Sequence, residues 1–148
     1  MAYNITVDFW ENQRFKPLQG GWASPFYGGF PNYSDLVGQD VAKGSCLNDD
    51  SLYLPSGWAW LDEWKVDSSG YFGEADEQGW SYAASFDSLV KASQDRLLRK
   101  ERGALLVTRR RRWIRVAKCV DAKAIEREAE RTVRLQWLIS ECRSRSKI

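Results

Sequence analysis

Histidine is absent from the 148 residues of this sequence, and cysteine is scarce. Without an imidazole, the chain lacks the commonest general base and the commonest metal ligand. The three cysteines, Cys46, Cys119 and Cys142, form no CxxC pair and are odd in number, so we expect no disulfide framework and a reducing intracellular compartment. The sequence also contains no paired-carboxylate, nucleophile or glycine-rich phosphate motif. We therefore expect no enzyme, no cofactor and no small-molecule substrate.

Long apolar runs are missing as well. No run approaches the ~20 residues that a helix needs to cross a bilayer, so any membrane association is expected to be peripheral or through a partner. Four aspartates, Asp35, Asp62, Asp67 and Asp76, follow no EF-hand spacing. We expect them to pair with arginines, and we predict no metal site and a cytoplasmic protein that is peripheral on intracellular membranes.

Charge and tryptophan are plentiful and unevenly distributed. The net charge of +2 divides into 5 Lys and Arg against 14 Asp and Glu over residues 1–95, and 17 against 6 over residues 96–148. Of the eight tryptophans, six lie in the acidic half. Because arginine stacks on aromatic faces, we expect the two halves to fold against each other rather than form an acidic and a basic module.

Three segments of the acidic half alternate like half-buried strands. The first covers residues 2–17, where Tyr3, Ile5, Val7 and Phe9 share a face. In the second, residues 52–67, an extended chain places five side chains on one side, whereas a helix would scatter them: Trp58, Trp60, Asp62, Trp64 and Val66. In the third, residues 79–86, Trp80 and Tyr82 share a face.

A further strand is predicted over residues 104–120, after a helix over residues 87–102 that Gly103 is expected to end as a C-cap residue. The two faces of this strand differ in sequence: one has Arg109, Arg111, Trp113 and Arg115, and the other has Arg110 and Arg112.

We expect the first face to stack on the indoles of Trp58, Trp60, Trp64 and Trp80 in a sheet. Each such contact contributes ~0.5–1 kcal/mol when exposed and ~2 kcal/mol or more when desolvated. The other face, with Arg110 and Arg112, is expected to be a solvated basic surface. Arg111→Ala is therefore expected to destabilise the protein more than Arg110→Ala.

The chain is expected to end in an amphipathic helix over residues 121–142, with Asp121 as its N-cap residue. Apolar residues recur every four positions along it: Ile125, Ala129, Val133 and Trp137. Glu130 and Arg134 are spaced for an i,i+4 ion pair. Such a helix usually packs on its own sheet, and docking on a partner protein is the alternative.

Between residues 20 and 40 the chain is rich in glycine, proline and aromatic residues, which predicts a long ordered loop. Four of its rings are candidates for insertion at the headgroup boundary of a membrane: Trp22, Phe26, Tyr27 and Phe30. Burial against the sheet is the alternative for each ring. If the loop is the contact, replacing Trp22 and Phe26 by alanine abolishes liposome recruitment with little change in melting temperature.

Five ordered motifs resemble those of the dysferlin-domain family, which occurs in membrane peroxins, in a tectonin-repeat autophagy protein and as a stand-alone domain in a yeast sporulation protein. They are ENQR at residues 11–14, NYSD at 32–35, LPSGWAWLDEWKVD at 54–67, DEQGWSYA at 76–83 and RRRRWIR at 109–115. Phe15 and Tyr33 depart from the family pattern, which often has tryptophan at these positions. The resemblance covers roughly residues 3–118.

The resemblance implies a mainly β fold with added helices, in which a small antiparallel sheet is built on long strands and stabilised by stacked arginine and tryptophan side chains. It also implies a non-enzymatic role in the organisation, repair or biogenesis of intracellular membranes, with sphingomyelin, an anionic phospholipid or a membrane-bound protein as partner. The C-terminal helix lies outside the motifs, so we divide the chain into residues 1–120, the dysferlin-like domain, and residues 121–148, the helix and basic tail.

Nucleic-acid binding through the arginine run and the basic helix is the principal alternative. Against it, the run lies within an apolar strand, no DNA- or RNA-binding motif occurs, and the acidic half is expected to neutralise much of the positive field. A protein–protein adaptor that docks through the C-terminal helix is the third hypothesis.

Overall fold

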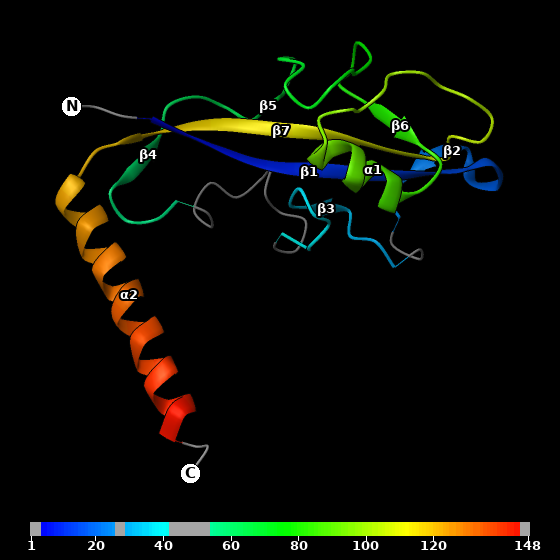
Figure 1. Ribbon diagram of the computed structural model, residues 1–148. Helices are drawn as coiled ribbons and strands as arrows, with labels where there is room; N and C mark the ends of the chain where they lie inside the picture. Colours follow the sequence, from blue (N-terminus) through cyan, green and yellow to red (C-terminus); the bar gives the residue numbers. More distant parts are fainter. Residues whose placement is uncertain (1–3, 26–28, 42–53, 146–148) are drawn as a thin grey trace.

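The computed structural model describes residues 4–25, 29–41 and 54–145, and these residues form one antiparallel sheet of seven strands with two α-helices. Two long strands dominate the sheet (Figure 1): β1 (Asn4–Lys16) and β7 (Thr108–Cys119). They pair antiparallel from Asn4 opposite Lys118 to Arg14 opposite Thr108. The predicted fold class, a mainly β protein with an antiparallel sheet on long strands and a C-terminal helix, is confirmed.

Within the described residues, five short strands complete the sheet, and each pairs antiparallel with one of the long strands. β2 (Gly21–Ala23) and β3 (Tyr33–Ser34) lie against β1, whereas β4 (Trp58–Trp60), β5 (Lys65–Val66) and β6 (Ser81–Ala83) lie against β7. A short 3-10 helix, η1 (Pro17–Gln19), joins β1 to β2. The two long strands are therefore the template on which every short strand aligns.

The strand predicted over residues 52–67 is instead, in its described part, two short strands, β4 and β5, separated by residues 61–64. The backbone leaves β7 there because the Asp62 carbonyl accepts a hydrogen bond from Arg115 Nε (2.5 Å) and Asp62 Oδ1 accepts one from the Val116 N–H (2.7 Å). Side chains thus occupy the positions at which a continuous strand would exchange backbone hydrogen bonds.

The helix predicted over residues 87–102 is shorter in the structure, where α1 spans Phe86–Gln94. It ends well before Gly103, so the predicted glycine cap is wrong. The chain adopts a left-handed conformation at Arg96 (φ 58°) and then extends, so that Leu98 forms a β-bridge with the loop before β6. The residues after α1 therefore pair with another segment instead of continuing the helix.

α1 covers the face of the sheet on which the even-numbered residues of β7 lie, and the hydrophobic core is on this side. Trp10 of β1 packs there against Phe86 and Leu89 of α1 and against Leu98. The rings of Phe30 and Phe86 stack with their centroids 4.3 Å apart. The core is therefore built between the sheet, α1 and the loops that precede β3 and β6.

Arg110 lies inside this core. Its side chain is fully buried, and its guanidinium carbon lies 4.3 Å from the centroid of the Trp10 ring. The guanidinium donates four hydrogen bonds, to the carbonyl oxygens of Leu36 and Asp35 and to the hydroxyls of Ser34 and Ser93. Burial lowers the pKa of Arg110 to about 9 against the opposing attraction of the Asp35 and Asp8 carboxylates, so the side chain remains charged at neutral pH.

The predicted solvated face of Arg110 and Arg112 is therefore wrong. α1 and the chain around residues 30–36 cover this face, and both arginines point into the covered side of the sheet. The alternation of side chains along β7 correctly predicts which residues share a face, but it does not indicate that the rest of the protein covers both faces.

α2 (Ala122–Arg145) projects from the end of the sheet where β4 lies and runs away from it (Figure 1). Asp121 caps its start, since Asp121 Oδ1 accepts a hydrogen bond from a backbone N–H of the first turn (3.1 Å). The loop before β4 anchors its base, because the Ser56 N–H donates to a Glu128 carboxylate oxygen (2.9 Å). The predicted helix is confirmed, but it does not pack along its own sheet.

No helix in the described part of the chain is long and apolar enough to cross a membrane.

Replacing Arg110 by alanine is expected to destabilise the protein strongly. The substitution removes four hydrogen bonds and leaves their buried acceptors unpaired, which lowers the free energy of unfolding by about 3 kcal/mol or more. Thermal unfolding followed by circular dichroism should then show a melting temperature at least about 10 °C below that of the wild type.

Lys118→Ala is the matched control, because Lys118 lies on the same face of β7 but is exposed. Its melting temperature should stay within about 2 °C of the wild type. Equal melting temperatures for Arg110→Ala and Lys118→Ala would contradict the placement of Arg110 in the core.

Candidate functional site

The odd-numbered face of β7 forms an alternation of guanidinium groups and indole rings, which we call the arginine–aromatic stack: Trp22, Arg109, Trp80, Arg111 and Trp113. Arg109 lies between Trp22 and Trp80, with its guanidinium carbon 4.5 Å and 4.0 Å from the two ring centroids. Arg111 lies between Trp80 and Trp113, at 4.3 Å and 5.0 Å. The predicted stacking of β7 arginines on indoles is confirmed. Each of these two guanidinium groups lies between two rings, so each arginine makes two cation–π contacts of about 0.5–2 kcal/mol each.

A second group of rings continues the stack toward the α2 end of the sheet. Phe9 of β1 stacks on Trp113 with centroids 6.4 Å apart and contacts Trp64 edge-on at 4.8 Å. Trp64 packs on Trp60 at 5.5 Å, and the Arg115 guanidinium lies 4.4 Å from the Trp60 centroid. One face of the sheet is thus lined with rings and cations from β2 to β4.

The structure assembles most of the residues predicted for this stack. Trp60 and Trp80 are stacked by arginines as expected, whereas Trp64 packs on other rings. Trp58 is half-buried in β4, where it lies opposite Cys119 of β7. Sequence reasoning missed Trp22 as a member, because its place beside Arg109 depends on the hairpin of β1 and β2.

Side chains of β1 orient the two stacked arginines. Arg109 donates hydrogen bonds to Gln13 Oε1 from Nε (2.9 Å) and Nη2 (2.5 Å), and Arg111 Nε donates to Glu11 Oε1 (2.7 Å). The Trp113 indole N–H donates to the same Glu11 oxygen (3.1 Å). The ENQR motif therefore supplies an amide and a carboxylate that fix the planes of the guanidinium groups.

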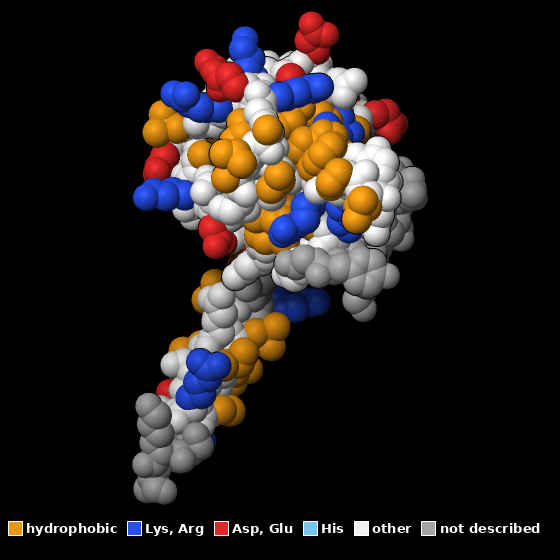
Figure 2. Space-filling model, turned by 90° about the vertical axis from the view of Figure 1, so that its right-hand side faces the viewer, with side chains coloured by type: hydrophobic (Ala, Val, Ile, Leu, Met, Phe, Trp, Pro, Cys, Tyr) orange, Lys and Arg blue, Asp and Glu red, His pale blue; other side chains and the backbone are white. Residues whose placement is uncertain are grey.

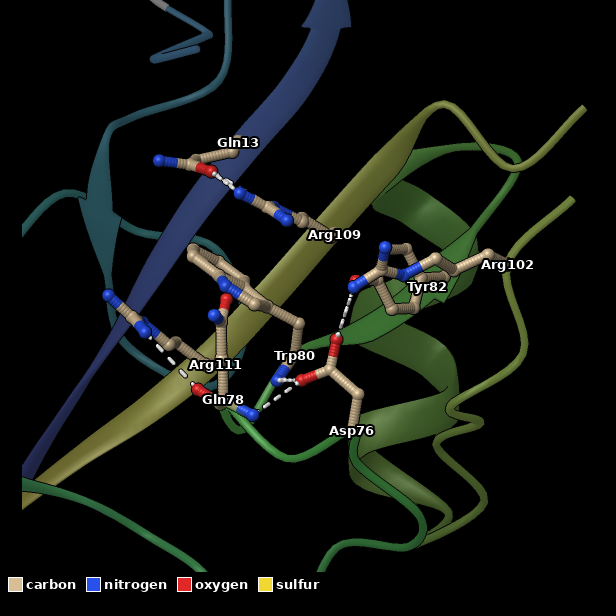
Figure 3. A network of polar contacts seen from close by, with 8 residues as sticks. All are labelled: Gln13, Asp76, Gln78, Trp80, Tyr82, Arg102, Arg109 and Arg111. Atoms are coloured by element: carbon tan, nitrogen blue, oxygen red, sulfur yellow. Dashed lines mark hydrogen bonds and ion pairs between the residues drawn. The ribbon is translucent and has the colours of Figure 1, made fainter. Parts of the chain in front are cut away.

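The turn before β6 places Trp80 between the two arginines (Figure 3). Asp76 Oδ1 accepts hydrogen bonds from the backbone N–H groups of Gln78 and Trp80, both at 2.9 Å, and Asp76 Oδ2 accepts one from the Tyr82 hydroxyl (2.6 Å). Gly79 has a φ of 86°, and a Cβ there would lie 2.2 Å from a side-chain atom of β5. The DEQGWSYA motif is thus the turn that positions the Trp80 ring.

The ionised form of Asp76 is favoured by the fold. Burial raises the pKa of this carboxyl, but hydrogen bonds from Tyr82 and from the backbone of Trp80 and Gln78 lower it by more, so the pKa lies below 3.8, its ordinary value. Arg102 adds an ion pair at 3.3 Å. Asp76 therefore stabilises the folded state at neutral pH, and this contribution is lost as the pH falls through its folded-state pKa.

Arg112, on the core side of β7, is engaged as well. Its guanidinium carbon lies 5.0 Å from the Phe72 centroid, and it forms ion pairs with Asp8 (2.7 Å) and Asp67 (2.9 Å). Burial lowers the pKa of Arg112, but these two carboxylates raise it by more. All arginines of the run are therefore in internal contacts: Arg109, Arg110, Arg111, Arg112 and Arg115.

The four aspartates considered as cation ligands bind groups of the protein itself. Asp35 and Asp62 accept backbone hydrogen bonds, whereas Asp67 and Asp76 also pair with arginines. Among residues 4–25, 29–41 and 54–145, no group of three or more His, Cys, Asp or Glu side chains is placed to hold a metal ion.

Two of the four predicted lipid-binding rings, Trp22 and Phe30, lie in the described residues, and both pack within the fold. Trp22 of β2 is half-buried, and its ring contacts those of Phe15 (5.4 Å) and Tyr82 (5.6 Å). Phe30 stacks on α1. Phe26 and Tyr27 lie outside the described residues. Trp22 and Phe30 thus have packing roles, and lipid binding by the four rings stays a prediction.

A further apolar surface, to which Trp22 also belongs, lies where β1 turns into β2. We call it the tip, and it consists of residues 14–23 and 99–107, which a hydrogen bond from the Phe15 N–H to the Val107 carbonyl joins (2.8 Å). Leu18 in η1 is fully exposed, Leu105 is 83% exposed and Phe15 is 41% exposed. Sequence reasoning missed these leucines, because single leucines in turns give no periodic signal.

The tip is also basic. Figure 2 looks onto this end of the molecule and shows hydrophobic side chains gathered there, with Lys and Arg side chains beside them. The tip contains five Lys or Arg residues and one Glu. Arg99, Lys100 and Arg102 are exposed, whereas the Arg14 guanidinium lies over the Phe86 ring and Lys16 donates a hydrogen bond to the Ser24 carbonyl. An exposed apolar surface beside cations is suited to the boundary between hydrocarbon and phosphate in a bilayer.

Comparison with known proteins identifies the family. The matching family model is Pex24p, described as an integral peroxisomal membrane peroxin, and the match covers residues 2–115. The chain belongs to this family. It is also similar to tectonin beta-propeller repeat-containing protein 1 of Homo sapiens, with 31% identity over 118 residues (77% of this chain and 9% of that protein), and of Gallus gallus, with 29% over 117 residues (77% and 9%).

The dysferlin-domain assignment made from the motifs is confirmed by these matches. At a coarse level, the family match places the chain among membrane-associated, peroxin-like domains. The chain spans less than a tenth of the length of the tectonin relatives. The family match ends within β7, so it includes most of the sheet, and α2 lies outside it.

Asp76→Asn is expected to lower the free energy of unfolding at neutral pH and to make this free energy less sensitive to acidification. Asparagine lacks the charge that Tyr82 and Arg102 bind, which lowers the free energy of unfolding by about 1–2 kcal/mol. The wild type loses this contribution as the pH falls below 3.8, the unfolded value, whereas the variant has no such contribution to lose. Urea unfolding at neutral pH and at steps down to about pH 2 measures both effects.

Glu77→Gln is the control in the same turn, since Glu77 is exposed. It should unfold as the wild type does at every pH. A decline of Asp76→Asn on acidification as steep as that of the wild type would show that Asp76 is not the group responsible.

Proposed function

We propose that this chain is a non-enzymatic module that docks peripherally on an intracellular membrane through the tip and serves in the organisation, repair or biogenesis of that membrane. The observation that supports this most directly is the tip, where exposed leucines lie among cationic side chains. Family membership supports it as well, because the matching model describes a peroxisomal membrane protein. The arginine–aromatic stack ends at Trp22 and so gives the tip a rigid support.

Two kinds of interaction favour this surface at a bilayer. Each leucine that is fully buried contributes about 1.5–3 kcal/mol, and Leu18 and Leu105 are exposed enough to insert without rearrangement of the fold. Each cation near an anionic surface contributes about 1 kcal/mol, and Arg99 and Lys100 of the tip are exposed for such contacts. We therefore propose an anionic phospholipid as the ligand and a reversible attachment that requires both interactions.

Leu18→Asp combined with Leu105→Asp is expected to weaken vesicle binding by at least about 100-fold. Each substitution removes about 1.5 kcal/mol or more of apolar burial and adds a negative charge beside the headgroups. Co-sedimentation with vesicles of phosphatidylcholine and phosphatidylserine measures the loss. The melting temperature should not change, because both leucines are exposed in the free protein.

Val120→Asp is the control, because Val120 is 57% exposed and follows the end of β7 that is remote from the tip. It should bind vesicles as the wild type does. Unaltered binding by the double leucine variant would overturn the role of the tip.

The composition of the vesicles separates the lipid classes. Binding that requires phosphatidylserine and weakens with salt supports the anionic headgroup, whereas equal, salt-independent binding to sphingomyelin vesicles contradicts that choice. A wild-type chain that ignores every vesicle but retards DNA or RNA at physiological salt would replace the membrane proposal by the nucleic-acid alternative.

Trp22→Ala is expected to lower the melting temperature, contrary to the expectation from sequence that this ring can be removed without effect. The substitution takes away one of the two rings that face Arg109 and the ring contacts with Phe15 and Tyr82. The cost is about 2 kcal/mol or more in the free energy of unfolding. Trp22→Phe keeps a ring and should retain most of the stability, and an unchanged melting temperature for Trp22→Ala would remove Trp22 from the stack.

A further inference from the structure

α2 has an apolar stripe that the rest of the described chain does not cover. Ala129, Val133 and Trp137 are four residues apart and lie on one side of the helix. Val133 is 65% exposed and Trp137 is 61% exposed. Beside them lies a shallow hollow of about 550 Å³, lined by Ala129, Glu130, Val133, Arg134 and Trp137.

The sheet leaves this side of α2 accessible. At the base of the helix, Ile125 faces Gly57, where a Cβ would lie 2.7 Å from Ile125 Cγ1, and Glu128 accepts a hydrogen bond from the Ser56 N–H. The stripe turns away from this contact by about 40° with every four residues, since a helix has 3.6 residues per turn. At Val133 it therefore no longer faces the sheet.

We propose that the stripe binds a second copy of this chain in an antiparallel α2–α2 pair centred on Val133. When Val133 of one copy meets Val133 of the other, Trp137 of each copy lies against Ala129 of its partner. The largest side chain of the stripe then fills the hollow beside the smallest. A parallel pair would set Trp137 against Trp137 and Ala129 against Ala129, with crowding at one level and a void at the other. A two-fold interface requires such self-complementarity.

The charges beside the stripe are self-complementary in the same arrangement. Glu130 and Arg134 are exposed on one flank, and within the described residues they form no ion pair with each other although their spacing allows one. The same flanks of two antiparallel helices meet, so Glu130 of one copy lies across from Arg134 of the other, twice in each dimer.

A lipid surface fits the stripe less well. Glu126 and Glu130 border it on one side, where anionic headgroups would repel them, and α2 begins at the end of the sheet opposite the tip (Figure 1). A long coiled coil is not indicated either, because Thr132 and Gln136 occupy positions that a heptad repeat requires to be apolar. The interface is short, so we expect dissociation in the micromolar range.

Sedimentation equilibrium of the full chain tests the dimer. At a protein concentration of about 100 µM, the mass should approach twice 17.1 kDa, and it should fall on dilution. Val133→Asp is expected to remain monomeric. Leu135→Asp is the matched control, since Leu135 is 53% exposed on the opposite side of α2, and it should dimerise as the wild type does. A monomeric wild type, or equal masses for the two variants at equal helix content, would overturn the proposal.

A charge exchange tests the antiparallel arrangement without altering the apolar stripe. Glu130→Arg and Arg134→Glu should each weaken self-association by at least about tenfold, because like charges then meet twice in each homodimer. Mixed together, one chain has two cations on the flank and the other has two anions, so a heterodimer should form at the concentration at which the wild type dimerises. A mixture with no more dimer than the separate variants would overturn the arrangement.

Discussion

The stacking of guanidinium groups on aromatic rings is the interaction on which the rest of this structure depends. A sheet is stable when its apolar faces are covered, and α1 covers only one face of this sheet. On the other face, the arginine–aromatic stack is the covering layer, since rings from β2, β4 and the turn before β6 close over the strands. Arginine suits this position because its planar guanidinium is weakly hydrated and accepts a ring on each side while its edge donates hydrogen bonds. Glu11 and Gln13 use that edge, and so couple the layer to β1.

The core side uses the same chemistry in a different way. Arg110 has Trp10 against its plane and neutral oxygen atoms around its edge, from the β3 region and from Ser93 of α1. A charge in this position costs desolvation, which is why burial lowers the pKa of Arg110 to about 9. In return, a single side chain links β7, α1 and the loop that follows β3. Apolar side chains would fill the same volume but would leave the carbonyl oxygens without donors.

The sequence predicts best what depends on neighbouring residues. Side chains alternate along any extended chain, so the pattern from Arg109 to Arg115 indicates which residues share a face, and the alternation around Trp60 predicts that an arginine stacks on this ring. It does not indicate what covers the second face, because that depends on the docking of α1. The end of α1 at Gln94 and the break at Asp62 were missed for the same reason, since each is set by a hydrogen-bond partner remote in the sequence. The tip was missed because Leu18 and Leu105 become neighbours only through the pairing of β1 with β7.

That pairing joins the two ends of the sheet-forming chain, and it constrains how the protein is made. Gln13 and Arg109 are 96 residues apart in the sequence, and Asp8 and Arg112 are 104 apart. In a nascent chain, one edge of β1 can therefore pair early with β2 and β3, whereas its other edge stays unpaired until β7 has left the ribosome. Contacts between residues so distant in the chain are slow to form. Until they form, the unpaired edge of β1 is prone to pair with other chains. The sheet is therefore completed only when β7 is available, and a chain truncated before residue 108 keeps β1 but lacks the strand on which β4, β5 and β6 align.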